Sequence, residues 1–346
     1  MTDPTAVLAQ LGWDEHRTTE LAELGFDLSA AARVVRVDRG HATLRAIHGD
    51  LRVATDRLDL VLAVGDWLAM DDEGGVAAVL ARRSLLERRT PSESHASPAV
   101  AANVDVVCVA NALDHSFSAR RLERFLLVAW ESGARPLVVL TKADAHPAPA
   151  AAIEEAEAAA LATPVLAVSV RTGEGIDELR AHLAGSTAVL IGRSGAGKST
   201  LVNVLAGAEV AATADVRRDG KGRHTTTHRE LHCLAGGGVL IDTPGLRAVL
   251  PHDAGLAAER AFGDIEELAA GCRFSDCRHA GEPGCAVAAA VAAGAVAQER
   301  FAAWQRAEHD RVSFERRGDA AAARAQRGHY KTLNKSLRAA RKKGWV

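Results

Sequence analysis

The stretch from Thr187 to Thr200, TAVLIGRSGAGKST, restricts the fold of this 346-residue chain more than any other feature. Its apolar start suits a buried strand, its middle matches the pattern G-x-x-x-x-G-K-S, and an apolar helical face follows. Strand, glycine loop and helix is the order that a phosphate-binding loop requires. The glycines let backbone N–H groups approach a polyphosphate at the positive end of the helix dipole. We therefore predict a nucleotide site, with phosphate contacts from Gly192, Arg193, Ser194, Gly195, Ala196, Gly197, Lys198, Ser199 and Thr200.

Five residues are expected to act on the terminal phosphates and on Mg²⁺. Lys198 would reach the β- and γ-phosphates, and the Ser199 hydroxyl would bind Mg²⁺. An Asp-Thr-Pro-Gly motif begins at Asp242, directly after an apolar run typical of a strand. We expect the Asp242 carboxylate to hold Mg²⁺ through water and the Gly245 amide to contact the γ-phosphate. A polar loop with the sequence GRHTTT supplies three threonines, one of which would complete the Mg²⁺ shell; which one stays open, and we favour Thr226.

Two further loops indicate that the base is guanine. Thr141, Lys142 and Asp144 form a T-K-x-D motif after an apolar run, and the Asp144 carboxylate can accept hydrogen bonds from guanine N1–H and N2–H₂. Adenine lacks both donors in that arrangement, so the motif selects the base. Ser169 and Val170 follow the next apolar run, where a backbone N–H would meet guanine O6.

The order of these motifs along the chain predicts a rearranged α/β fold. From residue 104 onward, continuous apolar runs alternate with helical patterns, which is typical of a mostly parallel, doubly covered sheet. In a standard GTPase the phosphate loop comes first, followed by the Mg²⁺-binding switch threonine, the Asp-x-x-Gly motif and finally the loops that recognise the base. Here those loops, the base readers around Asp144 and Ser169, come first. We therefore predict a circularly permuted P-loop GTPase domain, whose site survives because the parallel strands end at one sheet edge. The expected strands lie at 104–110, 137–140, 165–168, 231–234 and 239–241, and the expected helices at 121–131, 150–161 and 176–183.

The N-terminal part has the pattern of a small β-barrel. After a helical lead-in over 8–28, short β-prone runs alternate with turn-like segments, which favours an OB-like barrel, a fold that often binds nucleic acid. A polar segment with two prolines at 90–98 marks a loop or domain boundary. Near this boundary, Arg82, Arg83, Arg88 and Arg89 either contact phosphates or form a solvated charged face. The expected strands lie at 33–37, 42–48, 51–55, 59–64, 67–70 and 76–80.

A compact set of metal-binding residue types lies near the C-terminus. Cys272, Cys277, His279 and Cys285 form the pattern C-x4-C-x-H-x5-C. Three thiolates and one imidazole match a closed structural Zn²⁺ site, which leaves no position for a catalytic water. The chain beyond Gln298 is helical in pattern, and from Ser313 onward it carries ten Lys or Arg against two acidic residues. This tail favours RNA contact, and a merely solubilising basic helix is the alternative.

Composition adds little about partners and more about location. The formal net charge is −2, so the total charge indicates no partner. Cys108 and Cys233 lie in apolar runs, and we expect inert core thiols there. The longest apolar run, at 286–297, is too short to span a bilayer, and the first residues lack a secretion signal. We therefore expect a cytoplasmic monomer without membrane contact.

Together these residues resemble the RsgA (YjeQ) family, bacterial GTPases that depend on the small ribosomal subunit. The resemblance rests on V-G-D-W from Val64, on the permuted nucleotide motifs, and on C-x4-C-x-H-x2-E-P-G-C-A-V. It implies GTP hydrolysis to GDP, stimulated by the 30S subunit during its late maturation, and contact with 16S rRNA. It also implies an OB-like barrel at 33–97, a permuted GTPase domain at 98–254, and a zinc-binding helical domain with a basic tail at 255–346. We expect a lead-in at 1–32, before the part of the chain that carries the resemblance. One departure is Thr141, which stands where many GTPases have Asn and is expected to weaken a loop-bracing hydrogen bond.

The resemblance leaves the catalytic group open. Ras-like enzymes place a water-orienting Gln directly after Asp-x-x-Gly, and here that position is Leu246, so we expect slow intrinsic hydrolysis. Our hypothesis is that His224 swings towards the attacking water when the protein is on the ribosome; the alternative is a histidine that only packs in its loop. Two other functions stay open as well: a permuted GTPase of the large subunit, and a GTP-dependent RNA-binding scaffold with negligible hydrolysis.

Overall fold

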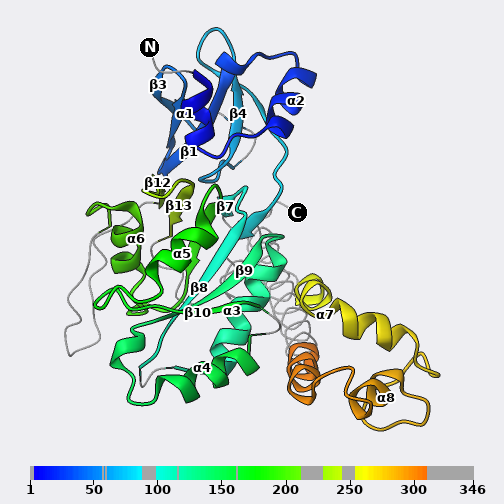
Figure 1. The fold of residues 1–346 in the computed structure, drawn as a ribbon. Helices are drawn as coiled ribbons and strands as arrows, with labels where there is room; N and C mark the ends of the chain where they lie inside the picture. The colour runs from blue at the N-terminus through cyan, green and yellow to red at the C-terminus, as the bar shows by residue number, and fades with distance from the viewer. Residues whose placement is uncertain are drawn as a thin grey trace, which may run out of the picture. The chain divides into compact units, whose positions relative to one another are not determined.

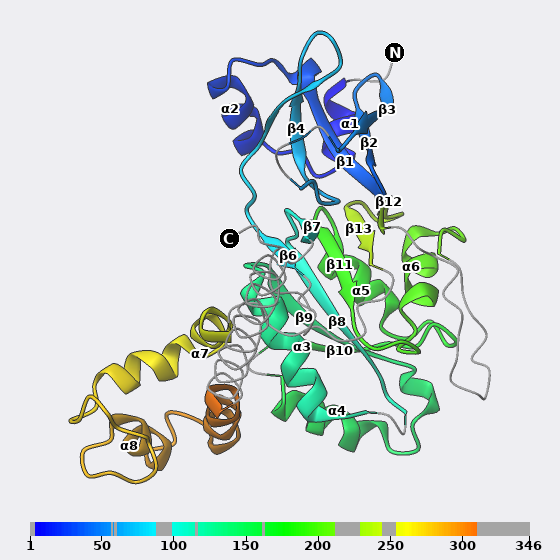
Figure 2. The ribbon, with the colours of Figure 1, turned by 180° about the vertical axis from the view of Figure 1, so that it is seen from behind.

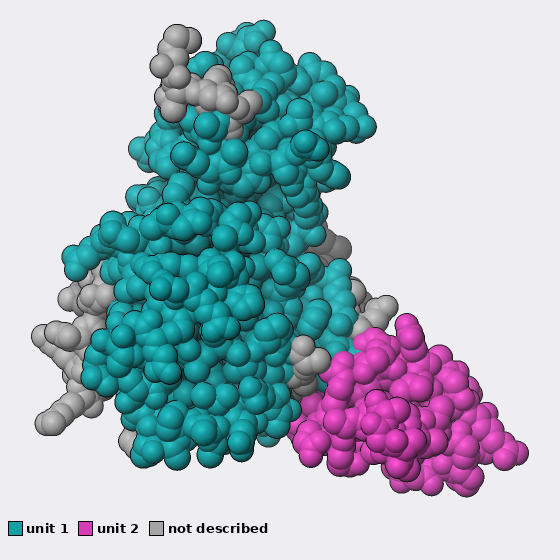
Figure 3. Space-filling view, viewed as in Figure 1, with its two compact units in different colours: residues 1–262 teal, residues 263–346 magenta. Residues whose placement is uncertain are grey.

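The computed structural model describes residues 4–56, 58, 61–87, 99–114, 117–160, 163–211, 229–243 and 254–309. It divides into two compact units, residues 1–262 and residues 263–346 (Figure 3).

A six-stranded part of the sheet in the first unit carries the nucleotide motifs (Figure 1). Its order is β10-β9-β8-β11-β13-β12; the first five of these strands run parallel, and β12 is antiparallel to β13. All residues of β8 and β11 are buried, as their continuous apolar sequences require of strands covered on both faces. The strands are β8 (Val106–Ala112), β9 (Arg135–Thr141), β10 (Val165–Ala167), β11 (Thr187–Ile191), β12 (Arg229–Cys233) and β13 (Val239–Asp242).

Helices pack against this sheet through apolar side chains. Leu179 of α5 (Ile176–Leu183) and Leu201 of α6 (Lys198–Ala206) share one core cluster with Leu190 of β11. The helix α3 (Ala119–Glu131) contacts β8 and β9, and also α4 (Pro149–Ala158), as Figure 2 shows from behind. The predicted α/β architecture is confirmed.

Strand order confirms the circular permutation. The chain enters this part of the sheet in its middle at β8, runs outward through β9 to β10, and returns beside β8 as β11, the strand before the phosphate loop. The base readers therefore precede the phosphate loop in sequence and still lie at the same sheet edge, where the parallel strands end.

The N-terminal part forms an antiparallel sheet in the order β3-β2-β1-β4-β5, behind a lead-in of two short helices. Ala32, Leu44 and Leu68 lie in its apolar cluster. Among the described residues no pairing joins β3 to β5, so barrel closure stays a prediction. Its elements are α1 (Pro4–Gln10), α2 (Glu15–Glu23), η1 (Leu28–Ala30), β1 (Ala31–Asp38), β2 (His41–Ala46), β3 (Gly49–Ala54), β4 (Trp67–Met70) and β5 (Val76–Val79).

Three details around this sheet differ from the sequence-based expectations. In place of the strand expected at 59–64, residues 61–64 contain only an isolated bridge from Val64 to Ala101. A short antiparallel pair, β6 (Leu85–Glu87) with β7 (Ala99–Ala102), flanks the proline-containing segment, which lies outside the described residues. Cys108 is buried, which raises the pKa of its thiol to about 12, whereas Cys233 is exposed at the end of β12 and is not a core thiol.

One strand joins the N-terminal sheet to the GTPase sheet. The strand β1 pairs along its length with β2, and its other edge is shared: Ala31–Arg33 pairs with β4, and Arg36–Val37 pairs with β12. A register shift between Val34 and Arg36 accompanies the change of partner. The two sheets are therefore continuous, which the sequence pattern did not indicate (Figures 1 and 2).

The second unit is small and helical. It begins within the helix α7 (Ala254–Ala270), directly after the departure from helical geometry at Phe262. The helix α8 (Ala286–Ala292) and a helical stretch at 298–309 follow. The basic tail beyond residue 309 lies outside the described residues. None of the helices in the described ranges is long and apolar enough to cross a membrane.

Candidate nucleotide site and metal centre

The phosphate loop connects the end of β11 to the start of α6. Gly192 has φ 142°, and a Cβ there would lie 2.2 Å from the Ala110 carbonyl oxygen of the neighbouring strand, so this position requires glycine. Gly197 precedes the first helical residue, Lys198, with φ 75°. The predicted order of strand, glycine loop and helix is thereby confirmed, and the N-terminus of α6 faces the loop.

Lysine and threonine side chains hold the loop in shape. The Lys198 Nζ donates to the carbonyl oxygens of Gly192 and Arg193, each 2.8 Å away. The Thr141 hydroxyl donates to the Ala196 carbonyl oxygen at 2.9 Å, and Lys142 Nζ donates to the Gly195 carbonyl oxygen at 2.8 Å. Thr141 therefore does brace the loop, although its side chain is shorter than the asparagine of many GTPases.

The Asp144 carboxylate lies between two donors. One oxygen accepts a hydrogen bond from the Ser169 hydroxyl, and the other accepts from Arg171 Nε at 2.5 Å. The bond from Ser169, followed by that from Arg171, lowers the pKa of Asp144, so the group is an ionised acceptor at neutral pH. An ionised carboxylate is what the paired N–H groups of guanine require. Arg171 was not among the predicted site residues, although it directly follows Ser169 and Val170.

A cavity of about 510 Å³ connects the base readers to the phosphate loop. Its size is in the range of small-molecule sites, roughly 300–1,000 Å³. It brings together residues that are far apart in sequence, from the ends of β9 and β10 and the start of α6. Its lining includes Thr141, Lys142, Asp144, Val168, Val170, Arg171, Gly197, Thr200 and Leu201.

Asp242 lies at the end of β13, next to the phosphate-loop strand. Its side chain is buried, which raises its pKa, while the nearby charges of His232 and Lys198 oppose that shift. The Thr243 hydroxyl donates to the Leu190 carbonyl oxygen at 3.0 Å and thereby ties this strand end to β11. The carboxylate of Asp242 and the hydroxyl of Ser199 are hard oxygen donors of the kind that suits Mg²⁺. The other predicted residues of this region, His224, Thr226, Gly245 and Leu246, lie outside the described residues.

The four predicted metal ligands of the second unit lie together. The donor atoms of Cys272, Cys277, His279 and Cys285 are all within 4.8 Å of one another. Cys272 Sγ is 3.9 Å from Cys285 Sγ, and His279 Nδ1 is 3.5 Å from each of these two sulfurs. Tetrahedral Zn²⁺ with Zn–S near 2.3 Å and Zn–N near 2.0 Å requires edges of about 3.5–3.8 Å. The donor set fits Zn²⁺, and so do the distances among Cys272, His279 and Cys285.

Neighbouring groups orient these ligands. The backbone N–H groups of Ala286 and Ala288 donate to Cys272 Sγ and Cys285 Sγ, each at 3.3 Å. The His279 ring packs edge-on against Trp304, with ring centres 5.0 Å apart, and the Trp304 indole N–H donates to Glu266 at 2.7 Å. Such outer contacts commonly fix the ligands of a metal site. Sequence reasoning did not identify Trp304, because it is remote from the cysteine motif.

Comparisons with known proteins agree with this geometry. The family described as RsgA GTPase matches residues 79–250. A Streptomyces coelicolor protein named small ribosomal subunit biogenesis GTPase RsgA is 45% identical over 94% of this chain and 92% of its own length. A protein of the same name from Syntrophotalea carbinolica is 42% identical over 94% of this chain and 95% of its own length.

Two solved structures have the same fold. YjeQ from Thermotoga maritima covers 82% of this chain and 98% of its own, with a TM-score of 0.61 and 26% identity. YloQ, described as a circularly permuted GTPase, has a TM-score of 0.59 and covers 82% of this chain and 95% of its own; at 21% identity it supports the fold alone. Because relatives more than 40% identical extend over nearly the whole length of this chain, the protein belongs to the RsgA family of GTPases.

Proposed function

We propose that this protein is a GTP hydrolase of small ribosomal subunit biogenesis, which binds the 30S subunit and hydrolyses GTP to GDP in response to it. The observation that carries this proposal is the cavity in which an ionised Asp144 and the phosphate loop meet. The curated relatives of closely similar length carry the name of this function. A guanine nucleotide and the small subunit are therefore the expected partners.

The groups that line the cavity and those of the adjoining phosphate loop and β13 each have a proposed role. Asp144 accepts the two guanine N–H donors, and the backbone near Ser169 and Val170 meets guanine O6. The N–H groups of residues 192–200 and Lys198 bind the phosphates; Lys198 would exchange its carbonyl acceptors for phosphate oxygens. Ser199, Asp242 and Thr226 are the proposed ligands of Mg²⁺, which would neutralise charge on the phosphates.

Activation by the partner is part of the proposal because the chain lacks the usual water-orienting glutamine. Leu246 has no polar atom in its side chain, and His224 is the proposed replacement once the subunit is bound. Groups supplied or rearranged by a partner accelerate related enzymes roughly 10³–10⁵-fold. That acceleration corresponds to about 4–7 kcal/mol of activation barrier.

The remaining parts of the chain have supporting roles in this proposal. The parts are a lead-in at 1–32, an OB-like barrel at 33–97, the GTPase domain at 98–254 and a zinc-binding domain at 255–346. The metal is structural, because four protein ligands complete a tetrahedral shell. The barrel, the zinc domain and the basic tail would contact 16S rRNA, with the protein acting as a cytoplasmic monomer.

Phosphate release measured with GTP or ATP, and with 30S, 50S or no subunits, tests the proposal directly. We expect slow release from GTP alone, strong stimulation by 30S subunits, and no comparable release from ATP. Stimulation by 50S subunits instead would favour the large-subunit function. Stable GTP-dependent binding to 30S subunits without any phosphate release would favour the scaffold.

A further inference from the structure

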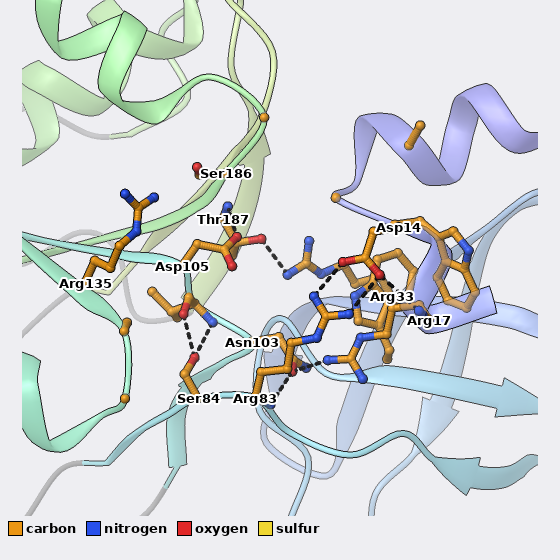
Figure 4. Close-up of a pocket in the computed structure, with 18 residues that line it drawn as sticks. Asp14, Arg17, Arg33, Arg83, Ser84, Asn103, Asp105, Arg135, Ser186 and Thr187 are labelled. Carbon is orange, nitrogen blue, oxygen red and sulfur yellow. Dashed lines mark hydrogen bonds and ion pairs between the residues drawn. The ribbon is translucent and has the colours of Figure 1, made fainter. Parts of the chain in front are cut away.

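Arg33 of β1 is a buried cation at the junction between the N-terminal sheet and the GTPase sheet. Its side chain is 1% exposed. The guanidinium donates to the Leu11 carbonyl oxygen, to the Gly65 carbonyl oxygen at 3.3 Å, and to the Thr187 hydroxyl at 2.9 Å. It also lies 4.9 Å from the centre of the Trp67 ring. One side chain therefore contacts the lead-in, the N-terminal sheet and the phosphate-loop strand. Figure 4 shows Arg33 and the Thr187 hydroxyl that it contacts.

The charge of Arg33 is held without an ion pair among the described residues. Burial lowers its pKa to about 10, and the carboxylates of Asp105 and Asp66 oppose that shift, so the group stays a cation at neutral pH. Its acceptors are neutral oxygens arranged around a planar fork, which an ammonium group cannot match. Removal of one acceptor would leave a buried N–H without a partner, which is costly.

The Thr187 hydroxyl accepts the hydrogen bond from Arg33. Thr187 is the first residue of β11, the strand that ends at the phosphate loop. Its backbone N–H donates to Asp105 Oδ2 at 2.7 Å, and its carbonyl oxygen accepts from the Asp105 N–H at 2.8 Å. Thr187 is thus fixed within the GTPase sheet, and its hydroxyl is the group that receives Arg33. A displacement of β1 would act on the base of the phosphate-loop strand through this contact.

The other end of β1 reaches a second GTPase strand. Arg36 and Val37 pair with Glu230 and Arg229 of β12. In sequence, β12 comes directly after the GRHTTT loop. A single strand of the N-terminal sheet therefore contacts both the phosphate-loop strand and the strand that follows the switch threonines.

We propose that Arg33 and Thr187 are positioning residues for subunit-stimulated GTP hydrolysis. Their hydrogen bond transmits the binding of the 30S subunit at the N-terminal sheet to the phosphate loop. This inference rests on the proposed function. Coupling between two sites is reciprocal, so the same bond makes 30S binding depend on the bound nucleotide. Typical coupling between sites changes affinity roughly 5- to 150-fold.

Thr187→Val tests the link, because valine keeps the shape of the buried strand residue and lacks the hydroxyl. We expect the 30S-stimulated kcat to fall roughly tenfold, the size of one hydrogen bond to a charged group. Basal kcat and the KM for GTP should stay as in the wild type. Arg33→Lys should give the same pattern, since lysine keeps the charge but not the fork.

Two control variants separate transmission from general damage at the junction. Thr187→Ser keeps the hydroxyl and should retain full stimulation. Ser84→Ala removes a buried hydroxyl that bonds to both backbone groups of Val104 at the same junction, without joining β1 to β11, and should also retain it. Thermal unfolding of each variant establishes that it is folded.

The outcomes are distinct from those that test the function itself. A wild type without 30S stimulation would contradict the proposed function. A stimulated wild type together with an equally stimulated, folded Thr187→Val would overturn the inference alone. A Thr187→Val variant that loses basal GTP hydrolysis, or that binds 30S subunits too weakly to be saturated, would also overturn it, because the bond would then support the fold or docking rather than transmission.

Discussion

The hydroxyl of Thr141 and the carbonyl oxygen of Ala196 are joined by a hydrogen bond of 2.9 Å, although they belong to different motifs. Thr141 ends the strand before the base readers, and Ala196 lies in the phosphate loop. The two halves of the nucleotide site are therefore connected by a direct hydrogen bond. Binding of the base and binding of the phosphates should consequently depend on each other.

Replacement of Thr141 by valine should weaken nucleotide binding. Valine keeps the volume and the strand propensity but leaves the Ala196 carbonyl without this donor, which costs about 1–3 kcal/mol when the group is buried. We expect the Kd for GDP to rise roughly tenfold for a loss near 1.4 kcal/mol. Calorimetric titration measures it. Thr141→Ser is the matched control, and equal affinities of the valine and serine variants would show that the bond is unimportant.

Asp144→Asn should change the preferred base from guanine to xanthine. Xanthine has a carbonyl oxygen where guanine has its N2 amino group, so it requires a donor, and the asparagine amide supplies one. We expect GTP binding to weaken by at least 100-fold, about 2.7 kcal/mol, and XTP binding to exceed it. A competition assay between GTP and XTP measures the relative affinity of the variant for the two nucleotides. A variant that still prefers GTP would show that the base is recognised by other residues.

Metal removal should unfold the second unit and leave the nucleotide site intact. In structural zinc sites the binding free energy contributes directly to folding. We expect one Zn²⁺ per chain, loss of helical signal in the zinc domain upon chelation, and unchanged GDP affinity. Cys277→Ser should reproduce the loss. Cys233→Ser is the control, because Cys233 is exposed and lies outside the cluster; a metal content lowered by that variant would contradict the assigned ligands.

The ion pair between Asp14 and Arg83 should give a stability difference that depends on pH. The hydrogen bonds from Arg83 lower the pKa of Asp14 from 3.8 to about 2. A folded-state pKa below the unfolded value stabilises the protein above about pH 4, and this stability is lost as the pH falls towards 2. Asp14→Asn keeps the helix cap of α2 without the charge. Denaturant midpoints of the two proteins should differ at pH 7 and converge near pH 2; a constant difference would rule out the ion pair as its source.

Sequence patterns identified the parts of the site that depend on local chemistry. Gly192 and Gly197 are required by the loop itself, and the strand ends before Asp144 and Asp242 follow from continuous apolar runs. Cys272 to Cys285 are close in sequence, so their spacing alone indicated the cluster. The α/β architecture and the permutation were predictable for the same reason, because each motif marks the end of one strand.

Long-range contacts could not be predicted from such sequence patterns. Arg33 has the sequence surroundings of an ordinary strand residue, and only the fold brings it to Thr187. The pairing of β1 with β12 depends on backbone hydrogen bonds, which carry no side-chain signature. Cys233 lies in an apolar-looking run but at the end of a strand, where its side chain is exposed.

The pairing of Arg36 and Val37 with β12 also has a practical consequence for work on isolated fragments. A GTPase fragment that lacks the first 38 residues would expose β12 as an edge strand with unpaired backbone N–H and C=O groups. Unprotected edges recruit strands from other molecules. Such a fragment should self-associate at high concentration, and a peptide that copies β1 should keep it monodisperse.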